Sequence, residues 1–88
     1  MAYYVYILQS EIDNSYYKGF SEHPLLRLEQ HNTGESHYTS TKKPWKLVCL
    51  LKFETKSEAL TKEKKLKKYS EASLRALIES SQNILNTK

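Results

Sequence analysis

The segment KLVCLLKFE, residues 46–54, constrains the fold more than any other part of the chain, because it predicts a strand with two apolar faces. Successive side chains of a strand point to opposite faces. The apolar side chains of this segment occupy both: Leu47, Cys49, Leu51 and Phe53 on one face, Val48 and Leu50 on the other. A sheet that is buried on both faces needs helices on both faces. We therefore expect this strand to belong to a sheet that is covered by helices on each side.

Two shorter strands precede this segment. Residues 3–9 (YYVYILQ) are rich in the aromatic and β-branched side chains that favour strands. Residues 11–14 are polar turn formers, and residues 15–20 form the return strand. The start of the chain therefore predicts a β-hairpin.

Three helical patterns complete the chain. The first begins near Pro24, and Ser21 is its expected cap. The other two cover residues 57–69 and residues 71–82, and Ser70 is the expected cap of the last one. The predicted element order is ββαβαα, which is an α+β fold.

The length of 88 residues is that of one small domain. We expect this domain to cover residues 1–82 and a polar tail, residues 83–88, to fray. No apolar run approaches the roughly 18 residues that a membrane span needs, and no secretory signal is visible. The single cysteine, Cys49, is interpreted as an apolar filler in a strand, and a reducing, cytoplasmic location is expected.

Positive charge is concentrated in one part of the chain. The net charge of the whole chain is +4. Residues 42–68 contain ten lysines and three glutamates, a net of +7, whereas residues 1–41 have a net charge of −3. A basic block of this kind indicates a polyanionic partner such as nucleic acid, or a solvated helix face. Charge alone leaves both interpretations open.

The helical segment KSEALTKEKKLKKY, residues 56–69, places a carboxylate among apolar side chains. At about 100° per residue, the apolar residues gather on one side of the helix: Ala59, Leu60, Leu66 and Tyr69. Glu63 is three residues from both Leu60 and Leu66 and falls inside this arc. An ionised carboxylate facing the core is costly unless it finds a cation, a metal or several donors. The sequence leaves two partners open for Glu63. One is a salt bridge to Arg27 or to a lysine, and the other is a divalent cation.

The first predicted helix carries Arg27 and His31 one turn apart on the same face. Arginine supplies a fixed fork of donors that suits a phosphate, and histidine exchanges a proton near neutral pH. Such a pair is also common on inert surface helices. The pair is therefore a candidate site only in combination with other residues.

The predicted hairpin carries two phenols near a glycine. If Tyr6 lies opposite Tyr17, the hairpin has a four-residue loop and both side chains lie on one face. Gly19 weakens the return strand and leaves open space beside the phenols. Tyrosines also simply pack well in strands, so the hairpin alone is not decisive.

Taken together, these residues resemble the GIY-YIG nuclease domain. Its two tripeptides correspond to Tyr4-Val5-Tyr6 and Tyr17-Lys18-Gly19, and Arg27 follows Tyr17 by ten positions, as in the family. The segments SEHPLLRLEQHNTG, YTSTKKPWKLV and SEALTKEKKLKK resemble the short stand-alone bacterial branch. The resemblance covers roughly residues 3–78.

The resemblance implies a small three-stranded antiparallel sheet flanked by helices, and hydrolysis of a DNA phosphodiester with one divalent cation. Glu63 would ligate Mg²⁺ or Mn²⁺, and Arg27 would hold the scissile phosphate. Tyr6 and Tyr17 would line the site and help to position or deprotonate the attacking water, and His31 is a candidate general base. The identity of the base stays open among these three. The missing side chain of Gly19 would leave room for the phosphate backbone to approach the phenols.

The chain departs from the family pattern in a few places. Tyr4 replaces the glycine of the first tripeptide, Lys18 occupies the middle of the second, and Phe20 stands where some excision-repair relatives have a lysine. Those relatives also carry a later asparagine, for which Asn83 is a poor stand-in.

The leading interpretation is a metal-dependent endonuclease that acts on branched, damaged or single-stranded DNA in repair or processing. The alternative is a catalytically weak or inactive nucleic-acid-binding module with the same fold. In both, lysines contact phosphates without reading sequence: Lys18, Lys42, Lys43 and Lys46. A protein–protein interaction domain is a third possibility.

Overall fold

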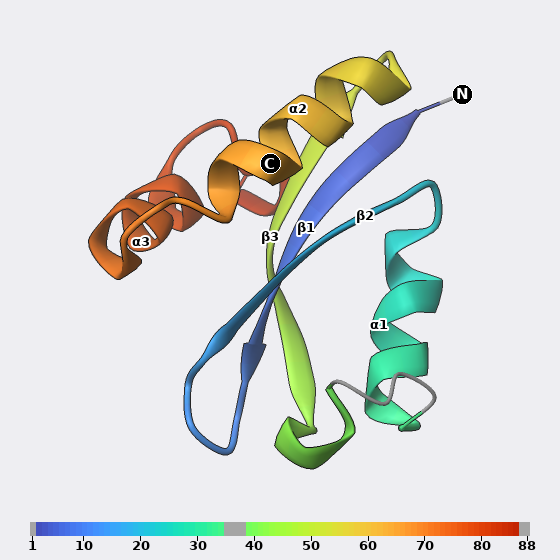
Figure 1. Ribbon diagram of the computed structural model, residues 1–88, viewed down its shortest axis with the longest axis vertical. Helices are drawn as coiled ribbons and strands as arrows, with labels where there is room; N and C mark the ends of the chain where they lie inside the picture. The colour runs from blue at the N-terminus through green and yellow to red at the C-terminus, as the bar shows by residue number, and fades with distance from the viewer. Residues whose placement is uncertain (1, 35–38, 87–88) are drawn as a thin grey trace.

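The computed structural model describes residues 2–34 and 39–86, and these residues form one antiparallel sheet with helices on both faces (Figure 1). The strands lie in the spatial order β2-β1-β3 and are β1 (Tyr3–Ser10), β2 (Tyr16–Ser21) and β3 (Trp45–Phe53). The helices are α1 (Pro24–Asn32), α2 (Lys56–Leu66) and α3 (Glu71–Glu79), with two short 3₁₀ helices, η1 (Ser40–Lys42) and η2 (Ile84–Asn86). The predicted α+β class and the order ββαβαα are confirmed.

The sheet separates two apolar layers. On one face, side chains of β1 and β3 pack against α2 and α3: Val5, Ile7, Cys49 and Leu51 against Ala59, Leu66, Leu74 and Leu77. On the other face, Tyr6, Leu8 and Trp45 pack together with Leu28 of α1. Helices therefore cover both faces, as the third strand predicts. Among the described residues, no helix is long and apolar enough to span a membrane.

An irregularity in β3 changes which side chains face α1. Ile7 pairs with Cys49 and Leu8 pairs with Leu47, so Val48 is an extra residue in the ladder. Such a bulge reverses the alternation of the strand at that point. Leu47 consequently packs in the layer of Tyr6, not in that of Cys49, which corrects the strict alternation expected from the sequence.

The end of the chain is folded against this bulge. Asn83 is fully buried. Its Oδ1 accepts a hydrogen bond from the Leu50 N–H at 2.9 Å, and its Nδ2 donates to the carbonyls of Val48 at 2.9 Å and Ile78 at 2.8 Å. The prediction that the chain frays from residue 83 is therefore wrong for residues 83–86, because one amide satisfies several buried backbone groups.

Replacing Asn83 by alanine removes the side-chain partner of the Leu50 N–H and of the Val48 carbonyl, whereas the Ile78 carbonyl keeps its bond from Asn86. We expect Asn83→Ala to lower the free energy of unfolding by about 2–4 kcal/mol, since each buried unsatisfied group costs about 1–3 kcal/mol. The measurement is chemical denaturation at neutral pH. Asn86→Ala is the matched control, because Asn86 is exposed although it bonds to the carbonyls of Ile78 and Ser80. Equal losses in both variants would contradict the assigned role.

Of the two caps predicted from the sequence, one is confirmed: Ser70 caps α3 by accepting from the Ser73 N–H. Thr55, for which no cap was predicted, caps α2 by accepting from the Glu58 N–H. The cap predicted at Ser21 is wrong, because α1 begins only at Pro24 and the Ser21 hydroxyl accepts instead from the His23 N–H at 2.8 Å. Both later helices are also shorter than predicted.

The hairpin register differs from the prediction by two residues. Tyr6 lies opposite Gly19, and Tyr17 lies opposite Leu8, so the two tyrosines are diagonal and not directly opposed. The last ladder pair is Gln9 with Tyr16, so six residues, 10–15, lie between the paired positions instead of the four that were predicted. Within this turn the Ser10 N–H donates to the Ser15 carbonyl at 2.9 Å. A shift of two residues preserves the faces of a strand, and the two phenols therefore still share one face.

Candidate active site along the edge of β2

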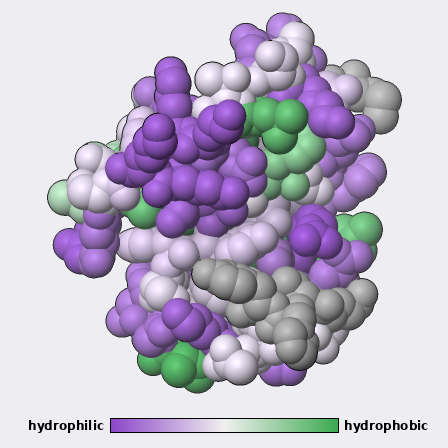
Figure 2. Space-filling view, viewed as in Figure 1, coloured by the Kyte–Doolittle hydropathy of each residue, from purple (hydrophilic) through white to green (hydrophobic). Residues whose placement is uncertain are grey.

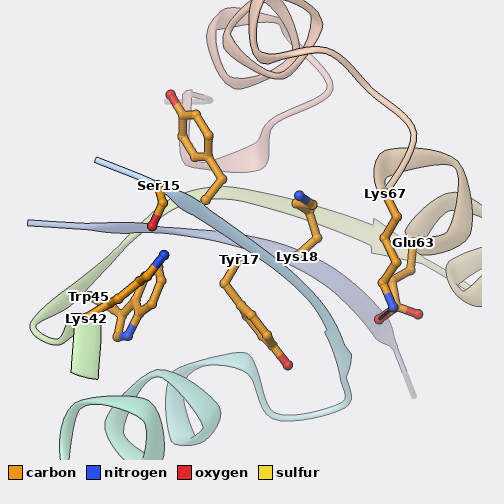
Figure 3. Close-up of a pocket in the computed structure, with 8 residues that line it drawn as sticks. Ser15, Tyr17, Lys18, Lys42, Trp45, Glu63 and Lys67 are labelled. Atoms are coloured by element: carbon orange, nitrogen blue, oxygen red, sulfur yellow. Dashed lines mark ion pairs between the residues drawn. The ribbon is translucent and has the colours of Figure 1, made fainter. Parts of the chain in front are cut away.

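A groove of about 500 Å³ runs beside β2, which is an edge strand of the sheet. Its lining comes from the hairpin, η1, β3 and α2: Ser15, Tyr16, Tyr17, Lys18, Lys42, Trp45, Glu63 and Lys67. Figure 3 shows Tyr17 and Lys18 between Trp45 and Lys42 on one side and the adjacent Glu63 and Lys67 of α2 on the other. The groove thus brings together residues that are far apart in the sequence.

Tyr6 lies beside Tyr17, with ring centroids 6.3 Å apart. Tyr6 is only 1% exposed, whereas Tyr17 is partly exposed and lines the groove. A Cβ atom on Gly19 would overlap with Cζ and the hydroxyl oxygen of Tyr6. The absent side chain therefore makes room for the Tyr6 phenol, and the expectation that it admits a phosphate backbone is corrected.

We expect Gly19→Ala to destabilise the protein by about 1–3 kcal/mol, because the buried Tyr6 ring cannot move aside without strain. A double-mutant cycle measured by denaturation tests the cause. In a Tyr6→Ala background, the added methyl group has space, and the cost of Gly19→Ala should largely disappear. An unchanged cost in that background would show that the strain lies elsewhere in β2.

His31, on α1, is fully buried and contacts Tyr6. Its Nε2 lies 3.3 Å from the Tyr6 hydroxyl, and its Nδ1 lies 2.7 Å from the Thr39 hydroxyl. Burial, and next the positive charge of Arg27, lower the pKa of His31 below 6.5. A neutral imidazole has one donor and one acceptor nitrogen. The contacts fit the tautomer in which Nδ1–H donates to Thr39 and Nε2 accepts from Tyr6.

The lowered pKa of His31 has a consequence for stability. The unfolded chain binds a proton at this group near pH 6.5, before the folded protein does. The contribution of His31 to stability is therefore complete above about pH 6.5 and is lost as the pH falls toward the folded pKa. We expect the free energy of unfolding to decrease across this interval, and the slope to be smaller in His31→Gln. Equal slopes in both proteins would contradict a lowered pKa.

Arg27 lies one turn before His31 on α1, and its Nη1 donates to Gln30 Oε1 at 2.6 Å. Burial raises the pKa of Tyr6 above 10, and a hydrogen bond and the positive charge from Arg27 oppose this rise in part. The negative charge of Glu63 raises the pKa of Tyr6 further. Tyr6 is therefore protonated at neutral pH and lies within the electrostatic reach of both Arg27 and Glu63.

Glu63 reaches the groove from α2, with 21% of its side chain exposed. Its Oε2 lies 3.9 Å from Nζ of Lys67, which is 60% exposed, so this ion pair contributes little. The sequence leaves a salt bridge and a divalent cation open as partners of Glu63, and in the structure the partner is the lysine Lys67. The predicted apolar arc is wrong at Leu60 and Tyr69, which are 40% and 36% exposed, and Glu63 consequently lies at the border of the core.

The donor chemistry around Glu63 suits a hydrated divalent cation. Within residues 2–34 and 39–86, no three His, Cys, Asp or Glu side chains are grouped closely enough to form a metal cage. Mg²⁺, however, commonly binds through one or two carboxylates and fills its other positions with water and substrate phosphates. A partly exposed carboxylate in a groove fits that mode of binding.

The four predicted DNA-binding lysines separate into two pairs. Lys18 and Lys42 line the groove, and Lys42 Nζ lies 3.3 Å from Asp13 Oδ2. Lys43 and Lys46 are exposed but are not part of the groove lining, and Lys46 lies on β3, at the far edge of the sheet from β2.

Sequence reasoning assigned no individual role to Thr39, Lys67 or the Trp45 side chain. Trp45 Nε1 donates to the Thr39 carbonyl at 3.0 Å, and this contact holds Thr39 against His31. No sequence spacing points to such a contact between a loop and a strand. Lys67 could have been found, because it follows Glu63 by four residues on one helix.

Comparison with known proteins agrees with this geometry. Residues 2–76 match the GIY-YIG catalytic domain. A UPF0213 protein of Listeria monocytogenes is 42% identical over 69 residues, which cover 77% of this chain and 76% of that protein. A UPF0213 protein of Staphylococcus aureus is 39% identical over 70 residues, which cover 78% of this chain and 84% of that protein.

A solved structure of another UPF0213 protein has a similar fold. The solution NMR structure of a UPF0213 protein from Bacillus halodurans matches with a TM-score of 0.60 and 31% identity, over 93% of this chain and 87% of that chain. The chain belongs to the GIY-YIG family, which is a nuclease superfamily. The names of these UPF0213 relatives state no activity.

Proposed function

We propose that the protein is a divalent-metal-dependent endonuclease that hydrolyses phosphodiester bonds in DNA. One observation carries the proposal: Tyr17 and Glu63 line the same groove, and Tyr6 and His31 lie directly behind Tyr17. Membership of a nuclease superfamily supports the same reaction class. A module that only binds DNA would not need a buried imidazole and phenol beside the groove.

Four residues of the chain would provide or hold positive charge near the phosphate. Glu63 would hold Mg²⁺ or Mn²⁺, which supplies positive charge against the negative charge that develops on the phosphate oxygens. Arg27, oriented by its hydrogen bond to Gln30, presents the planar donor fork that suits a phosphate oxygen pair. Lys18 and Lys42 attract the DNA backbone to the groove.

In the proposed reaction, the proton of the attacking water is transferred to His31 through the Tyr6 hydroxyl. Tyr17 lines the groove and orients the water, whose oxygen forms the new bond to phosphorus while the bond to the leaving oxygen breaks. Tyr6 is protonated and passes its proton to the neutral Nε2 of His31 as it receives one from the water. The leaving oxygen is protonated by solvent. In this scheme His31 is the final base, and Tyr6 connects it to the groove.

The test is cleavage of labelled branched, nicked and single-stranded DNA in Mg²⁺ or Mn²⁺. We expect Glu63→Ala to reduce the rate at least about 100-fold, the scale on which loss of a group that stabilises the transition state acts. Binding of the same DNA in EDTA should change little. Glu79→Ala is the matched control, because Glu79 is an exposed carboxylate at the end of α3 and should leave the rate unchanged.

The alternative is a DNA-binding module without efficient chemistry. The ion pair between Glu63 and Lys67 favours it, since a lysine then takes the place of the cation. Metal-independent DNA binding that survives Glu63→Ala, together with no cleavage of any tested form, would establish the alternative and remove the proposed reaction.

A further inference from the structure

A second groove, of about 650 Å³, lies along the outer surface of α2. We call it the α2 groove; it is lined by Lys56, Ser57, Leu60, Thr61 and Lys64, together with Glu63 and Lys67. Glu63 and Lys67 also line the groove beside β2, so the two grooves adjoin at these side chains. A polymer that enters one groove at Glu63 can therefore leave through the other.

The side chains of the α2 groove suit a phosphodiester backbone. Lys56 and Lys64 are exposed, and among the described residues neither forms an ion pair, in contrast to Lys67. The hydroxyls of Ser57 and Thr61 lie between the two lysines and are donors of the kind that contact phosphates. In sequence order, two hydroxyls thus lie between two cations in this groove.

Figure 2 shows the setting of this surface, with hydrophilic side chains gathered over the region of α2 and a small hydrophobic patch among them. Leu60 is 40% exposed and lies in the α2 groove. An aliphatic side chain between lysines offers contact area to a sugar or a base edge. It gives an apolar partner no large surface to cover.

We propose that the α2 groove is the path of the DNA strand that flanks the scissile phosphate. This inference rests on the proposed function, since it continues the path from the groove beside β2. The helical rise of about 1.5 Å per residue places Glu63 about 10 Å from the position of Lys56. With one charge per about 3.4 Å of each strand, this distance corresponds to about three phosphates. Lys64 and Lys56 each neutralise one of them.

The experiment measures binding of a fluorescent duplex and of its single strand in EDTA, as a function of KCl concentration. The variant Lys56→Gln/Lys64→Gln is compared with Lys52→Gln/Lys65→Gln, which removes the same charge from exposed lysines outside the α2 groove. We expect the first variant to reduce the salt slope by about 1.8 on the duplex and about 1.4 on the single strand. The second should change the slope by much less.

Further variants make the result decisive. Lys56→Arg/Lys64→Arg keeps the charge and should restore the slope, and circular dichroism shows whether each variant is folded. Equal losses in the two glutamine variants would overturn the proposed path, because they would indicate a diffuse field. An unchanged slope in both would overturn it as well. Binding in EDTA is independent of cleavage, so the path can fail while the nuclease assignment stands, and the reverse.

Discussion

The packing of the Tyr6 phenol over Gly19 joins the parts of this small fold. Tyr6 lies in the central strand, its ring fills the space above the edge strand, and its hydroxyl reaches the buried His31 of α1. A larger residue at position 19 or a shorter one at position 6 would separate the sheet from that helix. The contact that completes the core therefore also fixes the distance between the phenol and the imidazole.

A sheet of only three strands explains how one groove can use groups from both of its faces. Tyr17 belongs to the face covered by α1, whereas Glu63 is on α2, on the opposite face. In a wide sheet such groups would be separated by several strands. Here β2 is the edge, and side chains from both layers meet around it. The groove is therefore lined by Tyr17 and Trp45 from one layer and by the Glu63 carboxylate from the other.

The sequence predicted the elements and their order because the strand at residues 46–54 and the helical patterns carry strong periodic signals. The sequence did not predict the hairpin register. The turn is closed by a backbone hydrogen bond between Ser10 and Ser15, and such a bond gives no signal in the pattern of side-chain types. The buried position of Asn83 was missed for a related reason: a polar residue near a chain end gives no local sign of the backbone groups that it will satisfy. Contacts of single side chains with distant backbone are not periodic.

The Asn83 amide also affects how the molecule meets its neighbours. β3 is the second edge of the sheet, and an edge strand offers unpaired N–H and C=O groups to strands of other molecules. Asn83 forms hydrogen bonds with the Leu50 N–H and the Val48 carbonyl, so these groups cannot pair with a strand of another molecule. The helix η2 also packs against β3. The carboxyl-terminal turn thus protects one edge of the sheet against aggregation, while the other edge borders the groove beside β2.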